Sequence, residues 1–143
     1  AGAGDPRRHH LAGRGDPGLS RRQLAAWAPP LLYAVLVFTL SSMSRPQEII
    51  PPALLAQDKL AHLAEYTVLG ALLARALAAG GRRPARAFAW ALLLGALYGA
   101  SDELHQAFVP DRTAEVLDWV ADVAGTALGA AALLSLRRRG GTD

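Results

Sequence analysis

The sequence predicts an all-α membrane protein, a small bundle of four transmembrane helices with both termini in the cytoplasm. Of the 143 residues, 52% are hydrophobic and only 19% are charged, a composition too apolar for an ordinary soluble domain. The hydrophobic residues fall into four long runs, and about 20 apolar residues suffice for one helix to cross the hydrocarbon core. The chain contains no cysteine, so its fold depends on neither disulfides nor thiolate metal sites.

The first run, residues 24–43, follows a tail of residues 1–23 whose Gly, Pro, Arg and His content predicts disorder. Pro29 and Pro30 interrupt this run, and its last turns are polar. Its length also suits the apolar part of a signal peptide, but no small-x-small cleavage pattern follows it. We therefore expect the run to be retained as the first span.

The other three runs, residues 60–79, 85–108 and 116–136, are long enough to cross the membrane. Together with the first run they define one transmembrane domain over residues 24–136, followed by a short cytoplasmic tail of residues 137–143. The domain is expected to cross the plasma (inner) membrane of the cell several times, with membrane lipids as its immediate partners.

Arginine residues set the expected orientation. They gather before the first span, between the second and third, and after the fourth, as Arg7, Arg8, Arg14, Arg21, Arg22, Arg82, Arg83, Arg86, Arg137, Arg138 and Arg139. The opposite side has only Arg45, Lys59 and Arg112, so the positive-inside rule places both termini in the cytoplasm. The net charge of +3 does not predict nucleic-acid binding, because almost no aromatic residues are interleaved with these arginines.

Polar residues gather at the end of each span that this orientation places outside. The second run opens with polar residues, the third closes with them and the fourth opens with them: Asp58, Lys59, His62, Glu65 and Tyr66; Asp102, Glu103, Gln106 and Arg112; Asp118 and Asp122. An ionisable group at the centre of a membrane helix costs roughly 2.5 to 3.5 kcal/mol, so such groups usually face a partner or a wet cavity. The pattern predicts a shallow site at the outer face.

Helical periodicity places these polar groups on one face of each helix. At about 3.6 residues per turn, each of the last three runs has one face that combines polar groups with small or apolar residues. These faces are Asp58, His62, Glu65, Tyr66 and Leu69 in the second run; Gly95, Gly99, Asp102, Glu103 and Gln106 in the third; and Asp118, Asp122, Gly125 and Gly129 in the fourth. His105 points away from the polar face of the third run. Gly95-x-x-x-Gly99 and Gly125-x-x-x-Gly129 are typical of helices that approach closely in lipid. The polar faces are therefore expected to meet inside the bundle.

Three motifs occur in a fixed order within this domain. They are Asp58-Lys59-x-x-His62-x-x-x-Tyr66-x-x-x-Gly70, Tyr98-Gly99-x-x-x-Glu103-x-x-Gln106-x-Phe108-x-Pro110-x-Arg112 and Asp118-x-x-x-Asp122-x-x-Gly125-x-x-x-Gly129. In these motifs the chain resembles the VanZ-like family of bacterial membrane proteins, over about residues 40–136. The resemblance implies a four-helix membrane bundle with a role in the cell envelope, since the family is named for a protein associated with resistance to the glycopeptide teicoplanin.

The chain departs from the family pattern at two positions. The family usually has Asn where this chain has Asp122, and often has Gly where it has Asp111. An acid at Asp122 would permit metal binding or proton sharing with Asp118, or would keep its proton and act like Asn.

Our leading hypothesis is a site that binds or acts on an anionic envelope lipid or cell-wall component. In its enzymatic form, Glu103 and Asp118 are the acid and base, and His62 carries the proton. The residues expected to bind the substrate are Arg112, Gln106, Tyr66, Asp122, Asp58 and Lys59. The alternative is a non-catalytic assembly or binding module, in which hydrogen bonds between helices, each worth about 0.6 kcal/mol on average, only fix the packing.

Individual residues also have less specific interpretations. Arg112 would anchor to headgroups, paired with Asp111 or Glu115, instead of clamping an anion. Lys59 would be a headgroup anchor or a partner of Asp58, and Tyr66 would belong to the interfacial aromatic belt.

A metal site is a further alternative, drawn from His62, Glu65, Glu103, Asp118 and Asp122. The sequence contains neither HExxH nor paired histidines at ligand spacing, so no metal or cofactor is expected. A proton-coupled transporter is disfavoured, because the acids cluster in one layer and do not continue towards the cytoplasm.

Overall fold

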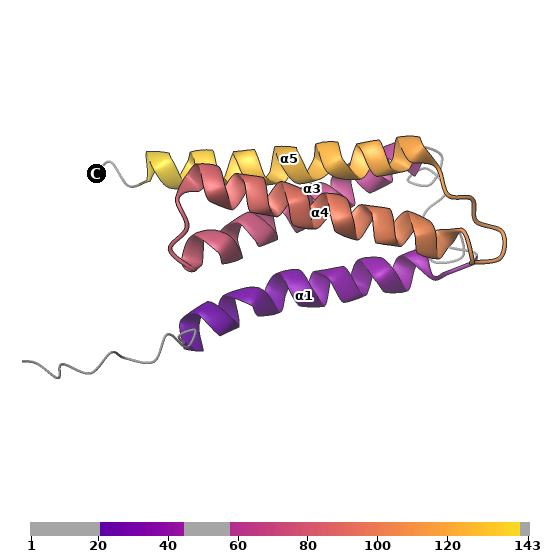
Figure 1. Cartoon of the computed structure of the whole chain (residues 1–143), viewed down its shortest axis with the longest axis horizontal. Helices are drawn as coiled ribbons and strands as arrows, with labels where there is room; N and C mark the ends of the chain where they lie inside the picture. The colour runs from indigo at the N-terminus through magenta and orange to yellow at the C-terminus, as the bar shows by residue number, and fades with distance from the viewer. Residues whose placement is uncertain (1–20, 45–57, 141–143) are drawn as a thin grey trace, which may run out of the picture.

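The computed structural model describes residues 21–44 and 58–140, which form four helices in one bundle (Figure 1). In chain order these are α1 (Arg21–Ser41), α3 (Asp58–Ala79), α4 (Pro84–Gln106) and α5 (Val116–Arg139). The described residues contain no strand, which confirms the all-α class. The predicted disorder of residues 1–20 and the side chain of Asp58 lie outside the described part.

Three of these helices are long and apolar enough to cross a membrane, namely α1, α5 and residues Lys59–Ala79 of α3. The third expected span, α4, is not among them, since Arg86 near its start and the polar residues near its end shorten its apolar stretch. This helix also ends at Gln106, two residues before the expected limit, because turns begin at Ala107.

The helices at the two ends of the chain extend beyond the predicted spans. The first helix begins at Arg21, so the predicted disorder is wrong for residues 21–23, and the helix continues without a break through Pro29 and Pro30. Prolines are tolerated within transmembrane helices where nearby groups satisfy the backbone atoms they leave unpaired. The last helix continues to Arg139, beyond the expected limit of residue 136.

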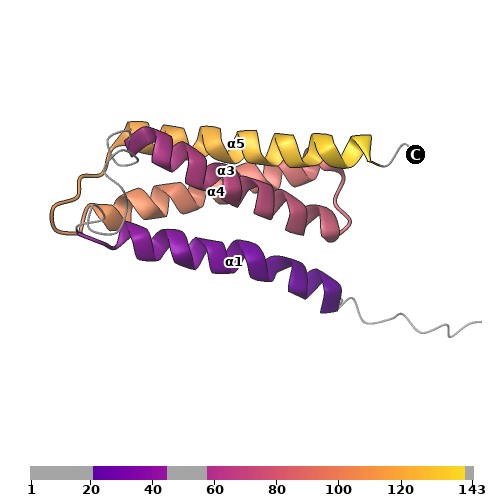
Figure 2. The ribbon, with the colours of Figure 1, turned by 180° about the vertical axis from the view of Figure 1, so that it is seen from behind.

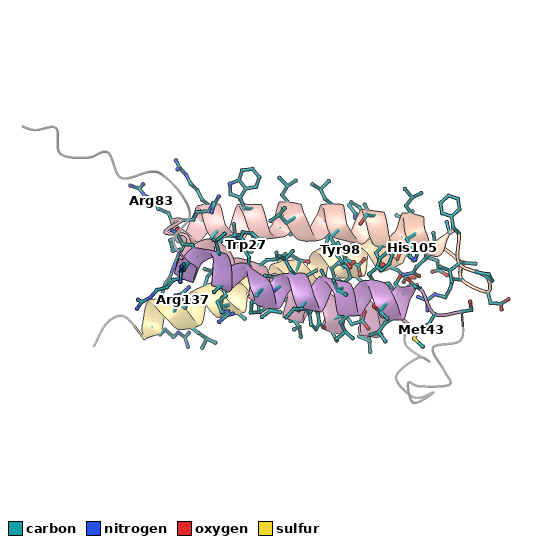
Figure 3. All side chains as sticks on the ribbon, turned by 90° about the horizontal axis from the view of Figure 1, so that it is seen from below. Trp27, Met43, Arg83, Tyr98, His105 and Arg137 are labelled. Atoms are coloured by element: carbon teal, nitrogen blue, oxygen red, sulfur yellow. The ribbon has the colours of Figure 1, made fainter. Side chains whose placement is uncertain are left out.

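Successive helices run in opposite directions, and both views of the ribbon show α3 and α5 side by side along their lengths (Figures 1 and 2). Consequently α1 begins and α5 ends at the same end of the bundle. Figure 3 shows Arg83 and Arg137 at that end, with Met43 and His105 at the other. The clustered arginines of the helices therefore lie at the end opposite the start of α3.

The interior of the bundle is lined by small and aliphatic residues, and its exterior is apolar. The core contains Val37, Tyr66, Leu69, Leu73, Ala74, Leu77, Ala87, Ala91, Ala130 and Leu134. Large apolar side chains on the outside include Leu31, Leu32 and Phe38 of α1, Trp90, Leu93, Leu97 and Leu104 of α4, and Leu117, Val120 and Leu128 of α5. An apolar exterior around a core of small residues suits lipid as the surrounding solvent.

Glycines allow α3 and α5 to pack backbone against backbone. A Cβ atom added at Gly125 would overlap the carbonyl oxygen of Leu63, and one added at Gly129 would overlap that of Thr67. On the facing helix, a Cβ at Gly70 would overlap the carbonyl of Thr126. This close approach was predicted from the glycine spacing, and it fixes the height at which α5 lies against α3.

Candidate functional site

At one end of the bundle α3 and α5 begin and α4 ends (Figure 1). Polar side chains of these three helices gather there. The residues buried there, called the polar layer below, are His62, Tyr66, Asp102, Glu103, Gln106, Asp118 and Asp122. On α4 and α5 they share the buried faces with Gly95, Gly99, Gly125 and Gly129, as helical periodicity predicts. The layer therefore lies inside the bundle and is shielded from lipid.

His62 and Asp122 join α3 to α5 within the polar layer. Nδ1 of His62 lies 2.8 Å from Oδ1 of Asp122, and both side chains are buried. An ionised carboxylate only accepts hydrogen bonds, so Nδ1 then carries the proton and Nε2 carries the lone pair. Gly99 makes room for this carboxylate, because a Cβ there would lie 2.8 Å from Oδ2 of Asp122. That oxygen is buried and has no hydrogen-bond partner among the described residues.

Lys59 covers the outer side of the polar layer. Its Nζ donates to Oδ1 of Asp118 at 2.9 Å and to Oε2 of Glu115 at 2.8 Å. The side chain of Asp118 is only 3% exposed, whereas those of Lys59 and Glu115 are about half exposed. Lys59 therefore bridges a buried carboxylate and a superficial one, in place of acting only as a headgroup anchor.

Glu103 presents one satisfied and one unsatisfied oxygen to the layer. Its Oε2 accepts a hydrogen bond from the backbone N–H of Glu115 at 2.8 Å, which ties the end of α4 to the residue before α5. Its Oε1 is buried and has no hydrogen-bond partner among the described residues. A buried carboxylate oxygen is almost always paired, so this oxygen points to a proton, a cation or a ligand group.

Arg112 reaches the layer through Gln106. Nη2 of Arg112 donates to Oε1 of Gln106 at 2.8 Å, and Nε2 of Gln106 donates to Oδ2 of Asp102 at 3.2 Å. None of the described carboxylates lies within ion-pair distance of Arg112, so the expected pairings with Asp111 and Glu115 are not found. Arg112 therefore keeps donor capacity on its guanidinium group at the rim of the layer.

Asp111, next to this arginine, has a φ of +63°. This is the left-handed region, in which Gly carries no steric penalty and Asp is tolerated better than most residues. The backbone here therefore gives a physical reason for the Gly that the family pattern often has at this position.

Two aromatic residues in or near the layer, Tyr66 and His105, pack against other aromatic rings. Tyr66 is fully buried with its ring centroid 6.1 Å from that of Tyr98, so it is not part of an interfacial belt. Its hydroxyl group has no hydrogen-bond partner among the described residues. His105 lies outside the layer, stacked on Phe38 and hydrogen-bonded to Ser42 of α1 at 2.9 Å. The prediction that His105 points away from the polar face is confirmed.

Three of the predicted site residues form a compact set of potential metal ligands. One atom each from His62, Glu103 and Asp118 lies within 4.8 Å of the other two, and all three residues are buried. Glu65, which the sequence offered as a further ligand, is not part of this set. The three residues that the sequence suggested as acid, base and proton carrier therefore lie near one another, and their catalytic role stays a prediction.

Two contributors to the site were not predicted as site residues. Glu115 supplies both a carboxylate to Lys59 and a backbone N–H to Glu103, yet the sequence shows only an acid just before a helix. Asp102 was expected on the polar face, but its buried Oδ1, which lacks a partner among the described residues, gave no signal in the sequence.

Comparison with known proteins yields one family match. The family model described as VanZ/LLP1 matches residues 27–137, which is more than half of the chain. The match confirms the resemblance seen in the sequence and extends it through most of α1. No curated protein and no solved structure matched the chain.

Proposed function

The chain belongs to the VanZ/LLP1 family, and on that premise we propose that it binds an anionic lipid or cell-wall component of the bacterial envelope. The binding site is the polar layer, at the outer face of the plasma membrane. The observation that carries the proposal is the burial of His62, Glu103, Asp118 and Asp122 at one end of an otherwise apolar bundle. Ionisable groups kept in such a place are expensive and usually functional.

The orientation follows from the arginines at the opposite end of the bundle. Arg83 and Arg137 mark that end in Figure 3, and Arg82, Arg86 and Arg138 lie on the same segments. The positive-inside rule puts this end in the cytoplasm and the polar layer outside. In this arrangement α4 is the fourth span, supported by the apolar side chains that it exposes along its length.

Arg112 is the proposed contact for the anionic group. Its planar guanidinium suits bidentate binding of phosphate or carboxylate, and only one of its donors is used by Gln106. Gln106, which is itself bonded to Asp102, holds Arg112 at the rim of the layer. A headgroup bound by this arginine would therefore lie near Glu103, which is on α4 together with Gln106.

In the enzymatic form of the proposal, the layer carries out hydrolysis or group transfer on the bound component. Glu103 or Asp118 acts as general base, since both are buried near His62. His62 carries the proton, and its bond to Asp122 fixes the orientation of the ring. This role assignment predicts that Glu103→Gln abolishes turnover while the folded protein remains abundant.

The test is lipid mass spectrometry on membranes from a strain lacking the gene. The strain is complemented with the wild type, with a combined Glu103→Gln and Asp118→Asn variant, or with His105→Gln as a matched control outside the layer. Restoration of one altered lipid or lipid-linked precursor by the wild type and the control alone supports the proposal. Equal profiles for all three proteins would remove the enzymatic form.

A structural role of the layer is the second candidate, and the bonds from His62 to Asp122 and from Lys59 to Asp118 favour it, because both join α3 to α5. A non-catalytic module would use these bonds to hold the bundle together or to dock a partner. Here the combined variant lowers thermal stability in detergent without changing the lipid profile. The two measurements on the same variants therefore separate the candidates.

A further inference from the structure

We propose that His62, Glu103 and Asp118 bind a divalent transition metal ion, with Asp122 orienting the histidine from behind. The proposal does not depend on the identity of the envelope component, and it replaces the acid, base and proton-carrier roles of the enzymatic form, because a side chain that holds an ion has no free lone pair for proton transfer. It concerns the chain itself and is tested on the purified protein without added lipid.

The distances suit one shared ion. A zinc-type ion takes nitrogen and oxygen ligands at about 2.0 to 2.2 Å in a tetrahedral arrangement, so two of its ligands are about 3.3 to 3.6 Å apart. The candidate atoms of the three residues already lie within 4.8 Å of one another. The set is therefore about 1 Å wider than one ion requires, and side-chain rotation is expected to close it.

The hydrogen bond of His62 is the one that metal-bound histidines make. Nδ1 lies 2.8 Å from Oδ1 of Asp122, and when the carboxylate is ionised and the ring is neutral, Nδ1 donates and Nε2 carries the lone pair. A ligating histidine usually donates its other ring N–H to a carboxylate or carbonyl, which fixes the ring and raises its basicity. Asp122 is completely buried and is placed to do this.

An independent observation comes from Glu103, which is 8% exposed. Its Oε1 is buried without a partner among the described residues, although its Oε2 is satisfied by the N–H of Glu115. A cation held between this carboxylate and His62 would pair with the unpaired oxygen. No other group among the described residues pairs with it.

The charges in the layer also call for a cation. The buried carboxyl groups of the described helices are Asp102, Glu103, Asp118 and Asp122, and among the residues described the only ammonium group bonded to any of them is that of Lys59. Buried ions need compensation, and Lys59 occupies only Oδ1 of Asp118. A divalent ion balances the remaining negative charge where the carboxylates converge.

The donor set indicates the kind of ion. One imidazole with two carboxylates favours Zn²⁺ or Mn²⁺ over Mg²⁺ and Ca²⁺, which take oxygen ligands almost exclusively. Three protein ligands leave at least one coordination position open, as in catalytic sites and unlike closed structural ones. The ion is therefore expected to accept an outside ligand.

The test is metal content and spectroscopy on the full chain in detergent. Protein stripped with a chelator is dialysed against Zn²⁺ or Mn²⁺ and analysed by elemental mass spectrometry. The wild type is expected to hold one ion per chain and to release it to the chelator. His62→Gln and Glu103→Gln are expected to lose it, while the matched controls His105→Gln and Glu65→Gln retain it.

Asp122→Asn distinguishes a positioning role from a ligand role. It keeps an acceptor oxygen for His62, so the ion is expected to bind about 10- to 100-fold more weakly without being lost. A wild type without bound ion, or a His62→Gln variant that binds as tightly as the wild type, would overturn the proposal.

A spectroscopic measurement keeps the test decisive if a ligand variant does not fold. The electron spin-echo spectrum of the Mn²⁺-loaded wild type should show coupling to one directly bound imidazole nitrogen. The same spectrum without nitrogen coupling would place the ion elsewhere and refute the site.

Discussion

Replacing Gly129 by Ala tests the contact that brings the polar layer together. The added Cβ would overlap the carbonyl oxygen of Thr67, and it would lie 2.8 Å from the Thr67 carbonyl carbon and 2.9 Å from the nitrogen of Ala71. Non-bonded carbon atoms prefer about 3.5 to 4.0 Å, so α5 must move away from α3 by roughly 1 Å. All three clashing atoms belong to the backbone, so no side chain can rotate away to relieve them.

Overpacking of this kind costs about 1 to 3 kcal/mol in measured cores. Ala is favoured over Gly inside a helix by about 1 kcal/mol, and this gain partly offsets the loss of stability from overpacking. A shift of α5 also stretches the 2.8 Å bond from His62 to Asp122, which adds to the loss. We expect Gly129→Ala to lower the free energy of unfolding by about 1 to 3 kcal/mol.

The assay is unfolding in mixed micelles of increasing denaturing detergent, followed by circular dichroism. The matched control is Gly140→Ala, where the nearest atom to an added Cβ is the carbonyl oxygen of Leu136 at 3.8 Å. That variant should be as stable as the wild type. If Gly129→Ala unfolded together with Gly140→Ala, the close packing of α3 against α5 would be refuted.

Three further changes probe other contacts. Asp122→Ala leaves Nδ1 of His62 without its acceptor and should lower the free energy of unfolding by about 1 to 3 kcal/mol, whereas Asp122→Asn should lose clearly less; equal losses in the same micelle assay would contradict the hydrogen bond. Asp111→Gly should be more stable than Asp111→Ala by about 1 kcal/mol in thermal unfolding, since the φ of +63° suits Gly, and the reverse order would argue against this turn. Gly95→Ala pushes a Cβ onto the side chain of Thr126, so adding Thr126→Ala should recover much of its loss, with a coupling of about 0.5 to 3 kcal/mol in a double-mutant cycle; simple additivity would speak against the contact.

The sequence predicted which faces of the helices are buried, because helical periodicity is a local property. Gly99, Asp102 and Gln106 are buried on α4 as expected, and Gly125 and Gly129 are buried on α5. The spacing of the glycines also predicted close approach between helices, since it reports directly on the room available to a backbone.

The partners within the polar layer could not be predicted in the same way. The bond from His62 to Asp122 depends on the height at which α5 lies against α3, which Gly125 and Gly129 set through three-dimensional contact. Lys59 bonds Glu115 for the same reason, across a separation of 56 residues. A pattern within one helix contains no information about such distances.

The apolar character of α1 and of α4 differs from what their apolar runs predicted. Pro29 and Pro30 interrupt the first apolar run, yet α1 is among the helices that are long and apolar enough to cross a membrane, whereas α4 is less apolar and is not among them. The polar end of α4 is the reason, since Asp102 and Glu103 lower the mean hydropathy of the helix.

The small residues that fill the half of the bundle opposite the polar layer have a consequence for how ions and protons could move through it. Ala74, Ala87, Ala91 and Ala130 are completely buried, and the aliphatic residues Leu73, Leu77 and Leu134 complete that region. The described core there offers no ionisable group that could pass on a proton or hold an ion. A ligand of the proposed site would therefore enter and leave at the end of the bundle where the polar layer lies.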